Sequence, residues 1–169
     1  MGNLKLTTAG DRELVMTRVF DAPRRLVYDA HTKAELVRQW LLGPPGWTMP
    51  VCEMDVRVGG KYRWVWRKDS DGSQMGMGGV YREVVAPERL VTTERFDEAW
   101  YPGESLNTLV LLEKDGKTTF TITVRYASRE IRDAVIKSGM EHGAAECYDK
   151  LAELLASPEA PVMERGAEA

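Results

Sequence analysis

A chain of 169 residues is long enough to bury a core in one domain without metals or disulfides. Hydrophobic residues make up 43% and charged residues 29%, a composition that is ordinary for a globular protein. Acidic residues outnumber basic ones by 26 to 23, and no block of Lys or Arg is present to follow a phosphate backbone. We therefore expect no nucleic-acid partner.

Nothing in the sequence suggests export or a membrane partner. Residues 1–6 lack the apolar segment of a secretory signal, and no apolar run approaches the ~20 residues of a spanning helix. The two cysteines, Cys52 and Cys147, are too few for a disulfide framework. We expect a cytoplasmic protein in which both are buried thiols.

The N-terminal part of the chain predicts one strand followed by two short helices. The strand covers residues 12–20, which are apolar and β-branched, and follows an N-terminal extension over 1–11. Helices are expected over about 23–30 and 33–40 because apolar positions recur there at helical spacing. Residues 43–46 include two prolines and must form a loop.

The middle of the chain is typical of an antiparallel meander. Apolar and β-branched segments alternate with turn signals such as Gly59-Gly60 and Asp115-Gly116. Short connections of this kind join neighbouring antiparallel strands. With the first strand they give a sheet of about seven, the six further strands covering about 49–57, 61–68, 76–85, 90–97, 106–114 and 117–126.

The last part of the domain predicts one long helix over 129–155. Ser128 is suited to cap it, and the helix needs the sheet as a partner because only one face is apolar. That apolar stripe consists of Met140, Ala144, Cys147, Tyr148, Leu151 and Leu155. A single domain over 12–156 results, followed by a polar tail over 157–169 that we expect to be disordered.

Aromatic side chains on one strand face are the strongest local signal for a site. Strand alternation places Tyr62, Trp64 and Trp66 together on one face. Further large side chains near the same surfaces complete the predicted ligand site: Trp47, Met77, Tyr81, Phe96, Trp100 and Met140.

Two interpretations of these aromatics remain open. They are core residues, because aromatic side chains bury large areas, or they line a cavity for an apolar ligand. Glycines on the same surfaces favour the cavity if they leave space unfilled, and favour the core if they mark close strand contacts. These glycines are Gly76, Gly78, Gly79, Gly139 and Gly143.

Glu94 has two possible placements. Strand alternation beside Phe96 would put its carboxyl in a partly apolar site, where it would be a candidate acid or base. A phase shift of one residue would put it on the solvent face or at the rim, the placement that we favour. We include Glu94 in the predicted ligand site.

No catalytic constellation is present in the sequence. His31, Cys52, His142 and Cys147 have the chemistry of metal ligands but no zinc-binding spacing, so no metal is expected. The nucleophile elbow and the nucleotide-binding fingerprints are absent, so no cofactor is expected. We expect a binding protein before an enzyme.

Several motifs together resemble a known family, the Hsp90-ATPase-activator-homologue-like (AHSA1-like) proteins. The resemblance covers about residues 12–156. It is carried by Thr17–Pro23, Val27–Ala30, Trp40, Cys52–Gly60, Gly79–Val84, Pro87–Val91, Gly139–Glu141 and Tyr148–Leu151.

The resemblance implies an α+β helix-grip fold of the START-like, or Bet v 1-like, superfamily. In this fold a curved antiparallel sheet wraps around a long C-terminal helix, two small helices follow the first strand, and a cavity lies between sheet and helix. Members of the superfamily hold lipids, polyketides or hormones there, and some are cyclases, dehydratases or hydrolases. The resemblance implies no universal catalytic residue.

Three hypotheses about function follow. The leading one is reversible binding of a hydrophobic or aromatic small molecule in the cavity. The second is an enzyme that acts on such a ligand, with Glu94 as the first residue to test. The third is a partner-binding protein, either a dimer that uses the outer sheet face or the loops around Trp47 and Trp100, or a chaperone cofactor in stress response, as the family name implies.

Overall fold

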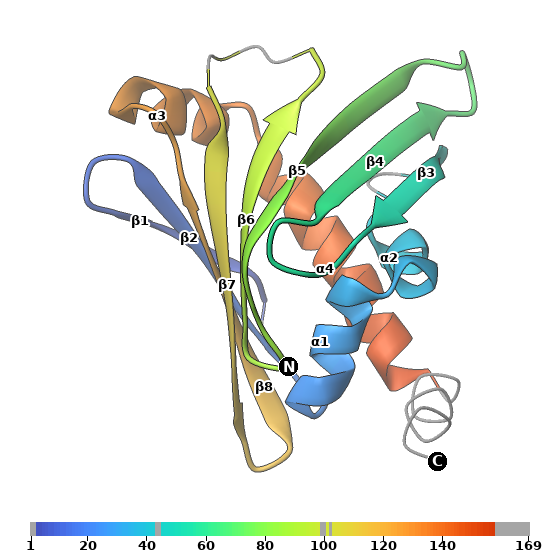
Figure 1. Ribbon diagram of the computed structural model, residues 1–169, viewed down its shortest axis with the longest axis vertical. Helices are drawn as coiled ribbons and strands as arrows, with labels where there is room; N and C mark the ends of the chain where they lie inside the picture. Colours follow the sequence, from blue (N-terminus) through green and yellow to red (C-terminus); the bar gives the residue numbers. More distant parts are fainter. Residues whose placement is uncertain (1–2, 43–44, 99–100, 102, 158–169) are drawn as a thin grey trace.

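Eight antiparallel strands form one curved sheet, and helices cover its concave face in the computed structural model (Figure 1). The structure describes residues 3–42, 45–98, 101 and 103–157. The elements are β1 (Lys5–Ala9), β2 (Glu13–Phe20), α1 (Arg24–Thr32), α2 (Ala34–Trp40), β3 (Trp47–Met54), β4 (Lys61–Lys68), β5 (Gln74–Val85), β6 (Arg89–Phe96), β7 (Ser105–Lys114), β8 (Lys117–Arg125), α3 (Arg129–Lys137) and α4 (Met140–Ala156).

The sheet order is β1-β2-β8-β7-β6-β5-β4-β3, so strands β3 to β8 form the predicted meander. The α+β helix-grip fold predicted from the sequence is confirmed.

The sheet has eight strands in the described chain, one more than the expected seven or so, because β1 lies within residues 1–11. That segment pairs Lys5 with Thr17 at the edge of the sheet. Its mixed polar sequence, with exposed and half-buried side chains, carries little strand signal.

The expected single C-terminal helix over 129–155 is wrong, because the structure divides it into α3 and α4. Gly139 has a φ of 84°, a left-handed conformation that ends a helix and that glycine adopts without penalty. Ser128 caps α3 as predicted, its hydroxyl accepting a hydrogen bond of 3.2 Å from the Ile131 amide. The longer α4 runs across the concave face of the sheet (Figure 1), and α3 packs against one end of it through a separate small cluster.

Irregular pairing bends the sheet around α4. The register shifts between Tyr81 and Glu83 on β5, and between Thr48 and Val51 on β3. An extra residue of this kind increases the local twist of a strand. The resulting curvature leaves β3, β4 and β5 folded over the helices (Figure 1).

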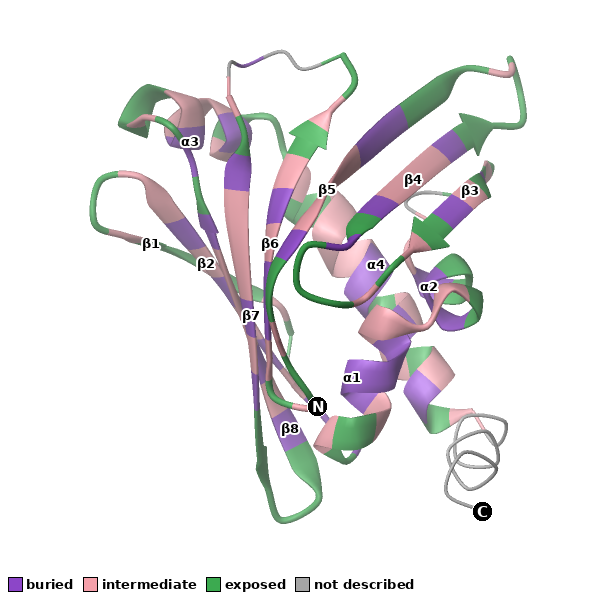
Figure 2. Ribbon diagram, viewed as in Figure 1, coloured by how far each residue is buried: buried purple, intermediate pink, exposed green. Residues whose placement is uncertain are grey.

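Strands and helices both carry buried residues (Figure 2), and most of these residues belong to one core cluster formed by the sheet together with α1, α2 and α4. Strand β2 alternates strictly, with Leu14, Met16, Arg18 and Phe20 buried. The predicted stripe of α4 is confirmed, with Cys147, Tyr148, Leu151 and Leu155 buried and Met140 and Ala144 half-buried. A second, smaller cluster lies beneath α3.

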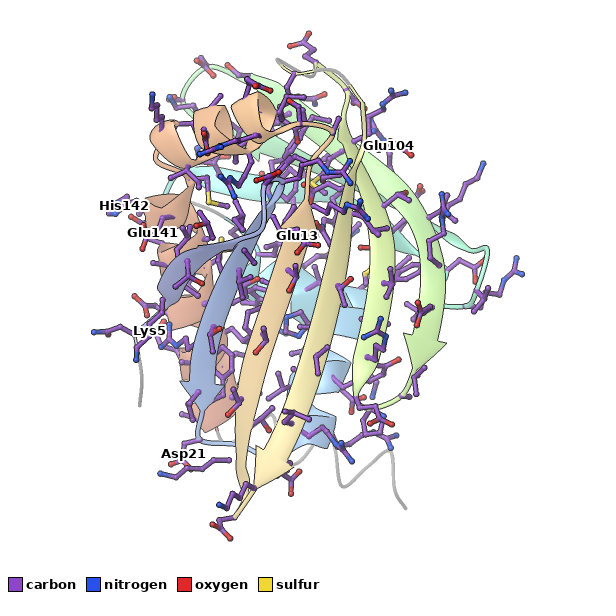
Figure 3. The ribbon with its side chains drawn as sticks, turned by 90° about the vertical axis from the view of Figure 1, so that its left-hand side faces the viewer. Lys5, Glu13, Asp21, Glu104, Glu141 and His142 are labelled. Atoms are coloured by element: carbon purple, nitrogen blue, oxygen red, sulfur yellow. The ribbon has the colours of Figure 1, made fainter. Side chains whose placement is uncertain are left out.

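The opposite face of the sheet carries the polar side chains, among them Lys5 and Glu13 of the first two strands (Figure 3). Lys5 is exposed, as strand alternation demands of a residue that faces away from the core. None of the helices in the described ranges is long and apolar enough to cross a membrane.

Candidate functional site

A cavity of about 200 Å³ lies between the sheet and the helices, and we refer to it as the inner cavity. Strands β4 to β8 supply one wall, and α1, α2 and α4 supply the other. The sheet side presents mainly large apolar side chains. The helix side presents His31, Val37, Trp40, Leu41 and Tyr148.

The aromatic wall of the inner cavity comes from the strand face predicted by alternation. Tyr62 and Trp64 have ring centroids 4.7 Å apart, Trp64 and Trp66 6.2 Å, and Tyr62 and Tyr81 5.6 Å. Tyr62, Trp66 and Tyr81 are buried, whereas Trp64 is half-buried. These rings therefore form part of the core and line the cavity, and the two interpretations of the sequence do not exclude each other.

A second depression of about 420 Å³, the outer hollow, lies next to the inner cavity. Its wall includes Trp47 of β3, Phe96 of β6, and Met140 and Gly143 of α4. The two spaces share four wall residues: Leu41, Trp66, Met77 and Tyr148.

The predicted site residues divide between these two spaces. Six line the inner cavity: Tyr62, Trp64, Trp66, Met77, Tyr81 and Glu94. Three line only the outer hollow: Trp47, Phe96 and Met140. Trp100 lies outside the described residues.

Glu94 lies on the cavity side of β6, so the expected solvent-facing or rim position is wrong. Its carboxyl accepts a hydrogen bond of 3.0 Å from the Asn107 amide and one of 3.4 Å from the Ser105 hydroxyl. Burial raises the pKa of the Glu94 carboxyl, and these two hydrogen bonds oppose the rise. Thr92, two residues earlier on β6, also lines the cavity, so strand alternation predicts the position of Glu94 correctly.

His31 is the main polar residue on the helix side. Its Nδ1 lies 2.8 Å from the carbonyl oxygen of Val27, and its ring stacks on Phe120 with centroids 5.6 Å apart. Burial lowers the pKa of His31 from 6.5 to about 4, and the contact with Val27 opposes the change. The imidazole is therefore neutral near pH 7.

Some of the glycines mark close strand contacts and one borders open space, so each of the two interpretations holds for part of them. A Cβ on Gly79 would clash with the carbonyl oxygen of Thr93, and one on Gly78 would press on the carbonyl of Tyr62, so these two mark close strand contacts. Gly76 is similarly confined by Asp97 and Arg63. Gly143 has open space in front of it and lines the outer hollow.

The family model described as activator of Hsp90 ATPase homolog 1-like protein matches residues 21–156. The chain belongs to this family. Among curated proteins, none matches it.

Solved structures of bacterial proteins share the family's fold. A protein from Rhodobacter sphaeroides is 33% identical, the match covers 92% of this chain and 99% of that one, and the TM-score is 0.86. Protein CV1439 from Chromobacterium violaceum is 29% identical over 86% of this chain and 98% of its own, with a TM-score of 0.76.

Several residues of the inner cavity were not predicted from the sequence. They come from the helices or from one or two positions on each of β6, β7 and β8: His31, Val37, Trp40, Leu90, Thr92, Asn107, Leu109, Ile122 and Tyr148. Tyr148 was recognised only as part of the apolar stripe of the C-terminal helix. Asn107 lies opposite Thr92 on the neighbouring strand, and this position was the signal by which it could have been predicted.

Among the described residues, no three His, Cys, Asp or Glu side chains are grouped to hold a metal ion. His142 projects from the surface at the start of α4 and pairs with Glu146 at 2.9 Å (Figure 3). The buried thiol of Cys52 contacts the carbonyl of Ala34 on α2.

Proposed function

We propose that this protein reversibly binds a hydrophobic or aromatic small molecule in the inner cavity. The observation that supports the proposal is the aromatic wall formed by Tyr62, Trp64, Trp66 and Tyr81 around a space of about 200 Å³. Ligand sites are typically apolar concavities with a few polar groups, which here are Glu94 and its neighbours. The outer hollow would take substituents that extend beyond the cavity.

A panel of hydrophobic ring compounds tests this proposal by thermal and chemical denaturation. A ligand at 100 times its dissociation constant should add about 2.7 kcal/mol to the free energy of unfolding. Native mass spectrometry of the purified protein would reveal a ligand retained from the cell. The proposal fails if no compound in the panel changes the melting temperature or the tryptophan fluorescence.

A matched pair of variants locates the binding. Ile122 is half-buried and lines the inner cavity, so Ile122→Phe should fill part of it and weaken ligand binding. Leu112 lies on β7 with 61% of its surface exposed, so Leu112→Phe should leave binding unchanged. Equal affinities for both variants would place the ligand elsewhere.

A second candidate function is catalysis on such a ligand, and the position of Glu94 favours it. A buried carboxyl with a raised pKa is a common general acid or base. Glu94→Gln keeps the shape of the side chain and removes its proton transfer. If a cavity ligand is found to be converted, unchanged turnover in Glu94→Gln would exclude this role.

A further inference from the structure

Buried polar atoms without a protein partner are concentrated around the inner cavity. Among the described residues, five buried side-chain nitrogen or oxygen atoms make no hydrogen bond. Three of them belong to residues that line the cavity: His31 Nε2, Trp64 Nε1 and Asn107 Oδ1. An unpartnered buried polar atom is costly, and most such atoms in proteins are satisfied. Their grouping indicates that a bound molecule supplies the missing partners.

Acceptors outnumber donors among these groups. His31 Nδ1 faces the carbonyl of Val27 and therefore carries the ring hydrogen, which leaves Nε2 as an acceptor. The Asn107 amide nitrogen donates to Glu94, so its Oδ1 is also an acceptor. Trp64 Nε1 is a donor, whereas the other two cavity indoles already donate, Trp40 to Ala30 and Trp66 to Leu41.

The ionisable charge in the cavity wall is also of one sign. Among the described residues that line it there is no Lys or Arg, and Glu94 is the acidic group. A ligand carboxylate placed here would lose its hydration, meet Glu94 and find no cation in the wall. A neutral group that donates a hydrogen bond meets none of these penalties.

Volume limits the size of the ligand. A protein cavity of about 150 Å³ holds benzene, so about 200 Å³ accommodates one substituted ring or a compact pair of fused rings. The aromatic wall suits a flat ring system, because offset and edge-to-face contacts between rings are favourable.

We propose that the inner cavity selects uncharged ring compounds that carry a hydroxyl donor, of the phenol or aryl alcohol type, and excludes their carboxylate analogues. This inference rests on the proposed function and adds the chemical class of the ligand. The hydroxyl group donates to Asn107 Oδ1 or His31 Nε2 and accepts from Trp64 Nε1. The ring lies against the aromatic face of β4.

Three probes of equal ring size test the selection by isothermal titration calorimetry on the full chain. They are naphthalene, its hydroxyl derivative naphthol and its carboxylate derivative naphthoate. One additional hydrogen bond should make naphthol bind roughly three- to tenfold more tightly than naphthalene. Naphthoate should bind about tenfold or more weakly than naphthol, because its charge is buried without a partner.

Variants assign the selection to particular atoms. Asn107→Leu and His31→Phe each remove one acceptor from the cavity wall, so the variant with the larger loss of naphthol affinity relative to naphthalene affinity should identify the acceptor that the hydroxyl uses. Thr108→Val is the matched control, because Thr108 follows Asn107 on β7 and strand alternation turns it to the other face. Glu94→Gln should reduce the discrimination against naphthoate.

The outcomes separate this inference from the proposed function. If naphthalene and naphthol bind equally, the hydroxyl selection is wrong while small-molecule binding stands. If naphthoate binds most tightly, the charge argument is wrong. If none of the three binds, the inference fails, and the wider panel of compounds decides the proposed function separately.

Discussion

The indole Nε1 of Trp66 donates a hydrogen bond of 2.7 Å to the backbone carbonyl of Leu41, at the end of α2. Both residues line the inner cavity and the outer hollow. The hydrogen bond between Trp66 and Leu41 therefore lies in the wall that the two spaces share, and it connects β4 to the end of α2. A ligand that extends from one space to the other must pass this pair.

Replacing Trp66 should connect the two spaces. Trp66→Ala removes the largest of the four side chains shared by the two walls, and we expect the variant to accept ring compounds too large for the wild-type cavity, at a stability cost of about 3–5 kcal/mol. Trp66→Phe keeps one aromatic ring but removes the hydrogen bond and part of the buried indole, so it should cost less than Trp66→Ala, about 1–3 kcal/mol. Ligand-size series on both variants, with denaturant melts, check this. Unchanged size selectivity in Trp66→Ala would show that Trp66 does not separate them.

The sequence predicts the aromatic wall on β4 better than it predicts the residues on the helix side of the cavity. Alternation along β4 places Tyr62, Trp64 and Trp66 on one face whatever the fold, because the period of a strand is two. Nothing local places His31 opposite them, since that contact depends on how α1 packs across the sheet. Gly139 could have been recognised as a helix end, because the apolar stripe of the predicted helix begins only after it, at Met140.

Acid should destabilise the protein through His31. Its pKa is lowered from 6.5 in the unfolded chain to about 4 in the folded state, so protonation favours unfolding. The contribution is complete above pH 6.5 and is lost as the pH falls to about 4, amounting to roughly 3 kcal/mol. Urea melts across this range should show the loss.

His142 provides the control for this pH dependence. Its side chain is 85% exposed, so His142→Phe should keep the acid sensitivity of the wild type. His31→Phe preserves a ring against Phe120 and should flatten the pH dependence between these limits. The same slope in His31→Phe as in the wild type would assign the effect to other groups.

Glu94 should limit stability at neutral pH. Burial raises the pKa of its carboxyl above the ordinary value of 4.5, so ionisation costs more in the folded state than in the unfolded chain. Its contribution is complete below 4.5 and declines as the pH rises through the folded pKa. We expect Glu94→Gln to be more stable than the wild type near pH 7, with the difference shrinking in acid. A destabilised variant at neutral pH would contradict this.

The ion pair between Arg18 and Asp149 should stabilise the docking of α4 on the sheet. The Arg18 side chain is 7% exposed, and its Nη1 lies 2.6 Å from the Asp149 carboxylate, which is 71% exposed. Asp149→Ala leaves a buried guanidinium without its anion and should cost about 2 kcal/mol.

Two further variants isolate this pair. Glu153→Ala, an exposed position on the same helix, should change stability by less than about 0.5 kcal/mol. Adding Arg18→Met to Asp149→Ala should recover part of the loss, because an apolar side chain replaces the unpaired charge. A double variant less stable than Asp149→Ala would mean that packing of the Arg18 stem, and not its charge, holds α4.

Glycine-to-alanine substitutions should distinguish a glycine in close contact with a neighbouring strand from one that faces open space. Gly79→Ala forces a Cβ against the carbonyl oxygen of Thr93 and should destabilise the protein by about 1–3 kcal/mol. Gly143→Ala meets no neighbouring atom and lies within α4, so it should stabilise by about 0.5–1 kcal/mol. Thermal melts measure both changes. Because Gly143 lines only the outer hollow, Gly143→Ala should leave the binding of compact ring ligands unchanged, and weakened binding would show that they occupy the hollow and not the inner cavity.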